Sequence, residues 1–172
     1  GVGSIGSRIA EICKAFGCRA IGITRENHGL EYVDEYFTQD VLHQALEKSD
    51  YVVVCLPLTE DTRQLIGKEE FKKMKKSAVL INVARGEIVD EAALVNALKN
   101  RDIAGAGLDV FEKEPLPRSS ALWKMKNVVI TSHYASISSL YDERMFKIFY
   151  ENLKAFLAEK PMENVVDKKR GY

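Results

Sequence analysis

GVGSIGSRIAEICKAFGCRAIGIT, residues 1–24, carries the pattern that decides the fold. A glycine motif GxGxxG occupies residues 1–6, apolar residues follow at helical spacing to Phe16, and Gly17 separates them from a short apolar run at 19–24. A glycine loop, a helix and a strand in this order are typical of a dinucleotide-binding unit. There the first glycine permits a tight turn, the second lets a pyrophosphate approach the backbone, and the third allows helix and strand to pack closely.

Beyond residue 24 the chain alternates helical patterns with short apolar runs. Helices are predicted at 40–48, opened by an Asp40 cap, at 68–74 and 90–99, and from a capping box of Ser139 and Asp142 to about residue 160. Strands are predicted at 51–56, 78–83, 103–110 and 127–131, and the unbroken apolar run at 51–56 is typical of a strand buried on both faces. The alternation predicts an α/β fold with a doubly wound parallel sheet, the Rossmann fold, and helices on both faces.

The glycine motif normally follows a strand, whereas this sequence starts at the first glycine. In the strand order 3-2-1-4-5-6 that first strand is central, so its loss predicts a gap of roughly 9–10 Å between its neighbours. A rearranged sheet is the alternative. Because unpaired edges in mid-sheet are unfavourable, we expect a fragment. It would comprise a dinucleotide-binding domain at 1–160, lacking its first strand and the separate substrate domain, and a tail at 161–172 that returns toward the missing domain.

Composition and charge argue against several classes of function. Lys plus Arg and Asp plus Glu number 25 each in the 172 residues, and this net charge of zero gives no support for nucleic-acid or membrane-surface binding. No apolar stretch approaches the roughly 20 residues of a membrane span. The three cysteines have neither a disulfide pattern nor metal-ligand spacing. We expect a cytoplasmic protein without a metal site.

The residues after the strand at 19–24 indicate which dinucleotide is expected. NAD-specific sites usually place Asp or Glu there, to bind the adenosine ribose hydroxyls. This sequence has Thr24 followed by Arg25. A carboxylate would repel a 2′-phosphate, whereas Thr24 removes that repulsion and Arg25 can pair with the phosphate. NADP is therefore favoured over NAD. The alternative is that Arg25 is a solvated loop residue, and Glu26 beside it weakens the signal.

Three further segments are predicted where strands end, which is where doubly wound sheets bind ligands. They are NVARG at 82–86, GLDVFEKEP at 107–115 and TSH at 131–133. Within them Arg85 is followed by Asp109 after 24 residues, Glu114 after five more and His133 after another 19. In residue type, order and spacing this set resembles the D-isomer-specific 2-hydroxyacid dehydrogenases.

The resemblance covers essentially the whole chain, to the terminal NVVD at 164–167 and RGY at 170–172. This tail, together with Thr24 and Arg25, is similar to the branch that includes glyoxylate and hydroxypyruvate reductases. The resemblance implies an oxidoreductase that uses NAD(P)H to reduce a small 2-oxo acid, of the glyoxylate or hydroxypyruvate kind, to a D-2-hydroxy acid.

The resemblance also assigns roles to four residues. His133 would protonate the carbonyl oxygen, and Glu114 would hydrogen-bond His133 and favour its protonated form. Arg85 would bind the substrate carboxylate through its planar fork and polarise the carbonyl. Asp109 would hold the nicotinamide amide or tune the catalytic pair electrostatically.

Further cofactor contacts follow from the resemblance. The full set comprises Gly1, Gly3, Ser4, Ile5, Gly6, Thr24, Arg25, Leu56, Pro57, Thr62, Val83, Ala84, Arg85, Asp109 and His133. Each residue alone has a structural alternative, since Pro57 could simply end a strand and Thr62 could cap a short helix. Their joint occurrence at this spacing favours the site.

In this family a second domain closes over the cofactor, so the fragment alone is expected to be inactive or nearly so. The resemblance also implies a homodimer. The alternative function is a dinucleotide-sensing binding module or corepressor related to the family, and an inactive fragment is a weaker possibility. Measured turnover, compared with cofactor affinity, would separate the three.

Overall fold

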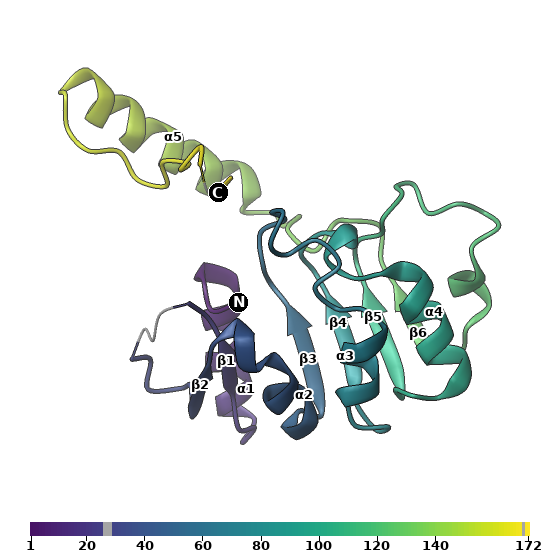
Figure 1. Ribbon diagram of the computed structural model, residues 1–172. Coiled ribbons are helices and arrows are strands. Elements are labelled where there is room, and N and C mark those ends of the chain that lie inside the picture. Colours follow the sequence, from purple (N-terminus) through teal and green to yellow (C-terminus); the bar gives the residue numbers. More distant parts are fainter. Residues whose placement is uncertain (26–28, 170) are drawn as a thin grey trace. The chain divides into compact units, whose positions relative to one another are not determined.

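The computed structural model of this chain describes residues 1–25, 29–169 and 171–172 (Figure 1). The chain forms two compact units, residues 1–132 and 133–172. The sequence placed a domain boundary near residue 160, after the long C-terminal helix, and that boundary stays a prediction.

Helices and strands alternate through the first unit, as the sequence predicts. In chain order its elements are α1 (Ser4–Ala15), β1 (Ile21–Ile23), β2 (Glu35–Phe37), η1 (Gln39–Val41), α2 (Leu42–Lys48), β3 (Tyr51–Val54), α3 (Lys68–Lys73), β4 (Val79–Asn82), η2 (Gly86–Ile88), α4 (Glu91–Asn100), β5 (Gly105–Leu108), η3 (Ala121–Lys124) and β6 (Val128–Ile130). The second unit contains α5 (Tyr141–Leu157). Within the described residues, no helix combines the length and the apolar character needed to cross a bilayer.

All the described strands pair in parallel, but they form two sheets. β1 pairs with β2, and β3, β4, β5 and β6 form a four-stranded sheet in that order. The division falls between β1 and β3 (Figure 1). The strands otherwise keep the doubly wound order, so the predicted α/β fold is confirmed and the sheet is not rearranged.

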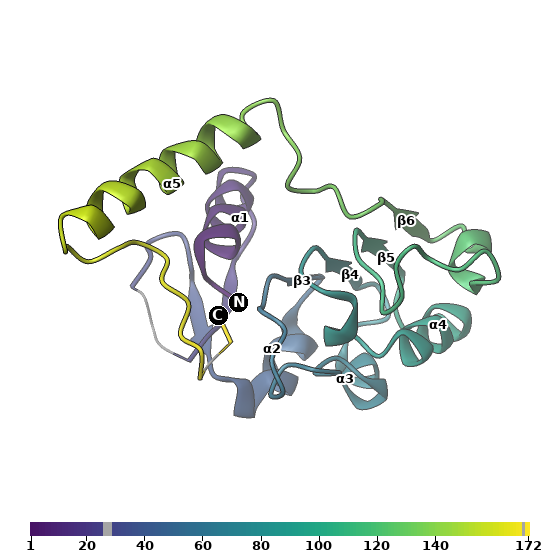
Figure 2. The ribbon, with the colours of Figure 1, turned by 90° about the horizontal axis from the view of Figure 1, so that it is seen from above.

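Helices α2, α3 and α4 cover one face of the four-stranded sheet, and α1 lies on the opposite side (Figure 2). Along β3, Val54 points to the covered face and is buried, whereas Tyr51 points to the other face and is 67% exposed. The prediction that 51–56 is buried on both faces is therefore wrong. The strand also ends at Val54, two residues before the predicted end.

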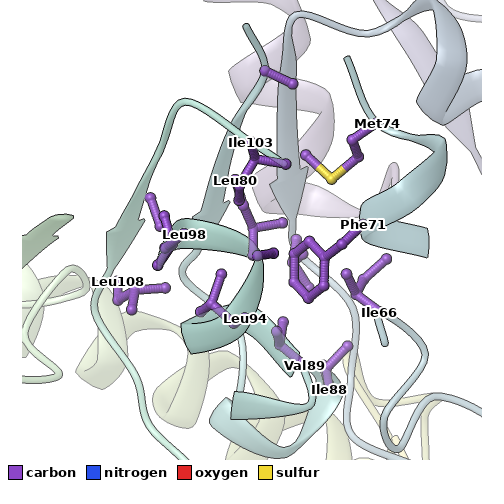
Figure 3. Packing of buried hydrophobic residues seen from close by; sticks show 14 of the residues in the cluster. Ile66, Phe71, Met74, Leu80, Ile88, Val89, Leu94, Leu98, Ile103 and Leu108 are labelled. Atoms are coloured by element: carbon purple, nitrogen blue, oxygen red, sulfur yellow. The ribbon is translucent and has the colours of Figure 1, made fainter. Parts of the chain in front are cut away.

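A cluster of apolar side chains fills the space between this sheet and its helices (Figure 3). Phe71 of α3, Leu80 of β4 and Leu94 of α4 are each at most 2% exposed, and Figure 3 shows them gathered together. Burying a side chain of this size stabilises a fold by about 1.5–3 kcal/mol. The cluster gives the ends of β4 and β5 a rigid base.

Two predicted helix caps are wrong. Asp40 lies inside the short turn η1, and α2 begins only at Leu42. The box of Ser139 and Asp142 caps nothing, since α5 begins at Tyr141 without a side-chain cap. A capping side chain must sit on an extended residue just before the helix, and in both places the chain enters the helix through a turn.

Candidate functional site

The carboxyl ends of the four parallel strands meet in one row. Register pairing crosses the sheet through Val54, Asn82, Leu108 and Ile130. Pairing continues one residue further, because the Asp109 N–H donates to the Asn82 carbonyl at 3.0 Å and the Thr131 N–H donates to the Leu108 carbonyl at 2.9 Å. The segments that carry Arg85 and Asp109 therefore leave the sheet side by side, as the sequence predicts.

Asn82 fixes the backbone on which Arg85 stands. Its side chain is 1% exposed, and its Nδ2 donates to the Arg85 carbonyl at 3.0 Å while its Oδ1 accepts from the Ala84 N–H at 3.0 Å. Arg85 itself is exposed, and its Nη1 donates to the Ala84 carbonyl at 2.6 Å. Sequence reasoning quoted Asn82 but gave it no role. The available signal was a polar residue ending an otherwise apolar buried strand.

The Arg85 segment touches the loop after β5 directly. A Cβ atom placed on Gly86 would lie 1.9 Å from the carbonyl carbon of Phe111 and 2.3 Å from the amide nitrogen of Glu112. Only glycine permits this approach, because any side chain would overlap backbone atoms. Glycine at 86 therefore brings together two loops that are 25 residues apart.

Asp109 and Glu114 are held by hydrogen bonds beyond the end of β5. Asp109 is 4% exposed, and its Oδ1 accepts from the Thr131 hydroxyl at 2.5 Å. Glu114 is exposed, and its Oε1 accepts from the Phe111 N–H at 3.0 Å. Thr131 is another residue that sequence reasoning quoted without a role, and its hydroxyl orients the Asp109 carboxylate.

His133 is the first residue of the second unit. It is exposed, with φ of +54°, in the left-handed region that non-glycine residues adopt at some energetic cost. Because the two units are separate bodies, the meeting of His133 with Arg85 and Glu114 stays a prediction.

The glycine motif forms a cradle at the start of α1. A Cβ on Gly1 would lie 2.7 Å from the Cys55 carbonyl oxygen, and a Cβ on Gly6 would lie 2.0 Å from the Gly1 carbonyl oxygen. Gly3, the N-cap of α1, has nothing within 4 Å of such an atom. The first and third glycines are thus required by close packing, while the second leaves its backbone open. That arrangement fits a pyrophosphate.

Thr24 and Arg25 follow β1, as the sequence predicts. The Thr24 N–H donates to the Phe37 carbonyl at 3.0 Å, which holds this strand end against β2. The exposed Arg25 guanidinium donates through Nη2 to Oδ2 of Asp61 at 3.1 Å. Asp61 lies in the loop after β3, so the residue expected to bind a 2′-phosphate is paired with a carboxylate. Glu26 lies outside the described residues.

Thr62 is buried and uses its hydroxyl within its own loop. Oγ1 donates to the Pro57 carbonyl at 2.7 Å and accepts from the Thr59 N–H at 2.8 Å. Thr62 thus fixes the loop that leaves β3, and direct contact with a cofactor stays a prediction. The other expected contacts lie at three places. Ser4 and Ile5 are exposed in the first turn of α1, Leu56 and Pro57 follow the end of β3, and Val83 and Ala84 follow the end of β4.

Comparison with known protein families agrees with a dinucleotide-binding domain. A family model described as "D-isomer specific 2-hydroxyacid dehydrogenase, NAD binding domain" matches residues 1–135. A glyoxylate reductase from Korarchaeum cryptofilum is 43% identical over 171 residues, which are 98% of this chain and 51% of that protein. The chain spans about half the length of the curated relatives it matches.

Two solved structures share the fold throughout the chain. One is a D-isomer specific 2-hydroxyacid dehydrogenase from Xanthobacter autotrophicus Py2 in complex with NADPH and MES, with 42% identity and a TM-score of 0.94, covering 100% of this chain and 70% of that one. The other is an NADPH-dependent glyoxylate/hydroxypyruvate reductase from Sinorhizobium meliloti in complex with NADP and sulfate. It has 35% identity and a TM-score of 0.93, covering 100% of this chain and 55% of that one.

Proposed function

This chain belongs to the family of D-isomer-specific 2-hydroxyacid dehydrogenases, and from that premise we propose that its protein transfers a hydride between NAD(P)H and a small 2-oxo acid. The product would be a D-2-hydroxy acid, with glyoxylate and hydroxypyruvate as the substrates. The observation that carries the proposal is the contact of Gly86 with the Phe111–Glu112 backbone. It holds a guanidinium-bearing loop and a carboxylate-bearing loop together at the ligand-binding edge of the sheet.

Arg85 is the proposed anchor for the substrate carboxylate. A guanidinium presents five N–H donors in a planar fork that matches a carboxylate. Asn82 fixes the backbone at Arg85, so the fork starts from a defined position. A cation at this place would also polarise the adjacent carbonyl and stabilise the negative charge that develops on its oxygen during reduction.

His133 is the proposed acid that neutralises this oxygen. Its imidazolium would give a proton from one ring nitrogen to the alkoxide oxygen, and near neutral pH imidazole is the side chain best suited to this task. The other ring N–H would donate to Glu114, which favours the protonated ring. The Phe111 N–H holds Oε1 of Glu114, so the carboxylate is oriented before the substrate binds.

The glycine cradle and neighbouring strand ends would hold the cofactor. The chemistry supplied by a bound dihydronicotinamide is hydride donation to the carbonyl carbon. Gly3 and the free N–H groups at the start of α1 would bind the pyrophosphate. Asp109, oriented by Thr131, would hold the nicotinamide amide or tune the field around it.

NADP is the proposed preferred dinucleotide. Thr24 puts no carboxylate at the end of β1, where NAD-specific sites carry one, and Arg25 follows it with an exposed guanidinium. The relatives crystallised with NADPH or NADP support this choice. The pairing of Arg25 with Asp61 means that a phosphate would compete with that carboxylate for the same cation.

The test is steady-state reduction of glyoxylate and hydroxypyruvate by the complete protein. We expect His133→Ala to lower kcat by about 10²–10⁴-fold, the usual contribution of a general acid. Arg85→Ala should lower kcat/KM by about 10²-fold or more, and Arg85→Lys should recover part of the loss. Activity that survives both alanine substitutions refutes the assigned roles. Tight NADPH binding without turnover in the wild-type protein would favour a sensing module instead.

A homodimer and a cytoplasmic location complete the proposal; the dimer rests on the likeness to the family, and the location on the composition of the sequence. Light scattering of the complete protein tests the assembly. A mass of one chain over a wide concentration range would contradict the dimer.

A further inference from the structure

The side-chain carboxylates of Glu91 and Glu112 each accept a hydrogen bond from the other residue's backbone N–H. The N–H of Glu91, the first residue of α4, donates to Oε1 of Glu112 at 3.0 Å. The N–H of Glu112, in the loop after β5, donates to Oε2 of Glu91 at 3.3 Å. These reciprocal bonds join the start of α4 to a loop 21 residues away.

This pairing brings two acidic side chains together at a cost. Burial raises the pKa of the Glu91 carboxyl, the nearby Glu112 charge adds to the rise, and the Glu112 N–H opposes it. The helix has a cap without them, because Asp90 accepts from the Ala93 N–H at 2.9 Å. The side-chain cap of α4 is therefore already supplied by Asp90, and the two glutamates are an additional pair of carboxylates at the same helix end.

The loop after β5 is anchored in the core by Phe111 and Leu116, but it is open beside Glu112. An open cavity of about 430 Å³ separates α4 from the loop, and its lining includes Glu91, Val95, Asn96, Glu112 and Ser120. The exposed Glu112 lies on this open side and does not belong to the apolar cluster that holds its neighbour Phe111. The reciprocal hydrogen bonds cross the edge of the cavity and support the loop there.

The supported loop carries the proposed site. Glu112 lies two residues before Glu114, and its amide nitrogen is among the atoms that the Gly86 backbone approaches. Arg85 precedes Gly86, and Glu114 is oriented by the Phe111 N–H. A shift of Glu112 would therefore move the backbone on which both side chains depend.

We propose that Glu112 and Glu91 are positioning residues that lock the Arg85 segment against the Glu114 loop. They act through hydrogen bonds to backbone N–H groups. These bonds fix the position of the Arg85 guanidinium relative to the Glu114 carboxylate. The consequence for catalysis rests on the proposed function, whereas the consequence for loop geometry does not.

The kinetic test substitutes Glu112 in the complete protein. Glu112→Ala removes the acceptor for the Glu91 N–H, and we expect kcat/KM for the 2-oxo acid to fall about 10–100-fold, the scale of a misplacement of about 1 Å. Glu112→Gln keeps Oε1 and should restore kcat/KM to within about threefold of wild type, because its amide oxygen accepts the same bond. The matched control is Asp90→Ala, which uncaps the same helix and should lower the melting temperature while leaving kcat/KM within about twofold.

Amide hydrogen exchange gives a readout that does not require turnover. In Glu112→Ala the amides of 84–88 and 110–114 should exchange about tenfold faster or more, whereas Asp90→Ala should affect only the first turn of α4. Unchanged exchange in both loops overturns the positioning role, whether or not the protein reduces a 2-oxo acid. Faster exchange in a protein that reduces no 2-oxo acid supports the positioning of the loops and overturns the proposed function. A Glu112→Ala variant that melts earlier but turns over like wild type shows a purely structural cap and overturns the inference.

Discussion

The two halves of the first unit are held together by different forces. In the four-strand half, residues 39–132, an apolar cluster lies between the sheet and α2, α3 and α4. In the glycine-loop half, residues 1–38, Val33 is the only buried apolar side chain among those the structure describes. Surface ion pairs such as Lys14–Asp34 and Arg19–Glu35 connect its elements. Exposed pairs contribute at most about 1 kcal/mol each, so this half is held more weakly.

The difference parallels the proposed division of labour. Arg85, Asp109 and Glu114 stand on the packed half, where catalytic geometry can be kept within narrow limits. The glycine cradle and Arg25 stand on the weaker half, and they contact the packed half through Gly1 at Cys55 and through Arg25 at Asp61. Weakly held segments open and adjust most readily. We therefore expect the cofactor-binding half to respond to ligand more than the catalytic half does.

The largest effect on stability is expected from Phe71→Ala. Phe71 is enclosed in the cluster, and removing a buried phenyl ring costs about 3–5 kcal/mol because a cavity remains. Val33→Ala is the counterpart in the glycine-loop half, where the loss of two carbon groups costs about 1.5 kcal/mol. Urea denaturation of the complete protein measures both. Equal losses would contradict the difference between the halves.

A second prediction compares two glycines, one from each half. Gly86→Ala should cost about 3 kcal/mol, because the new methyl group overlaps the Phe111 backbone, which cannot move aside cheaply. Gly3→Ala should cost less than about 1 kcal/mol, because open space surrounds the position. It should nevertheless weaken NADPH binding by blocking the pyrophosphate. Melting temperature and a fluorescence titration separate the two effects, and a Gly3→Ala variant with unchanged NADPH affinity would remove the cradle from the site.

Arg25 and Asp61 form an ion pair between the two halves. Removing one partner or the other should change the preference for NADPH over NADH in opposite directions. Arg25→Ala should weaken NADPH about 10–100-fold relative to NADH, since a hydrogen bond to a charged group contributes about 1.5–3 kcal/mol. Asp61→Asn removes the competing carboxylate and should favour NADPH a few-fold, an effect that salt diminishes. Dissociation constants for both dinucleotides give the ratio. Equal changes for NADPH and NADH in either variant would place the 2′-phosphate elsewhere.

The smallest expected effects concern how stability depends on pH. One acidic residue in each half should change this dependence, and the two changes should have opposite signs. Burial raises the pKa of Glu91, so its contribution to stability is present below the ordinary carboxyl pKa and is lost as the pH rises through the raised value. Lys14 and the Ala20 N–H lower the pKa of Asp34, so its contribution is present above the ordinary pKa and is lost as the pH falls through the lowered value.

Relative to wild type, Glu91→Gln should therefore gain stability between about pH 4 and pH 7. Asp34→Asn should lose stability relative to wild type at lower pH, as the pH rises from about 2 to about 5, and the difference should then stay constant. Chemical denaturation at several pH values measures both slopes. Slopes of the same sign would show that the two carboxyl groups do not differ in environment as described.

Local patterns predicted much of this fold. Apolar residues at helical spacing placed α1, and the turn at Gly17 ended it, because both depend only on neighbours in the chain. The strand ends that carry Arg85 and Asp109 followed for the same reason. Tyr51 was predicted to be buried, but it is exposed. Its exposure depends on which elements pack against β3, and the local sequence does not show this. Asp40 was assigned as a cap wrongly, because the path of the chain into α2 decides which residue is extended.

The residues themselves determined the glycine motif, the alternation of strand and helix, and the order of the reactive side chains. These properties are written in periodicity and in the backbone freedom of glycine, so they require no knowledge of distant neighbours. Tertiary structure alone decided that Gly86 meets Phe111 and that Glu91 and Glu112 exchange hydrogen bonds. Such contacts depend on how parallel strands align and how loops close over a cavity, and no local pattern encodes that alignment.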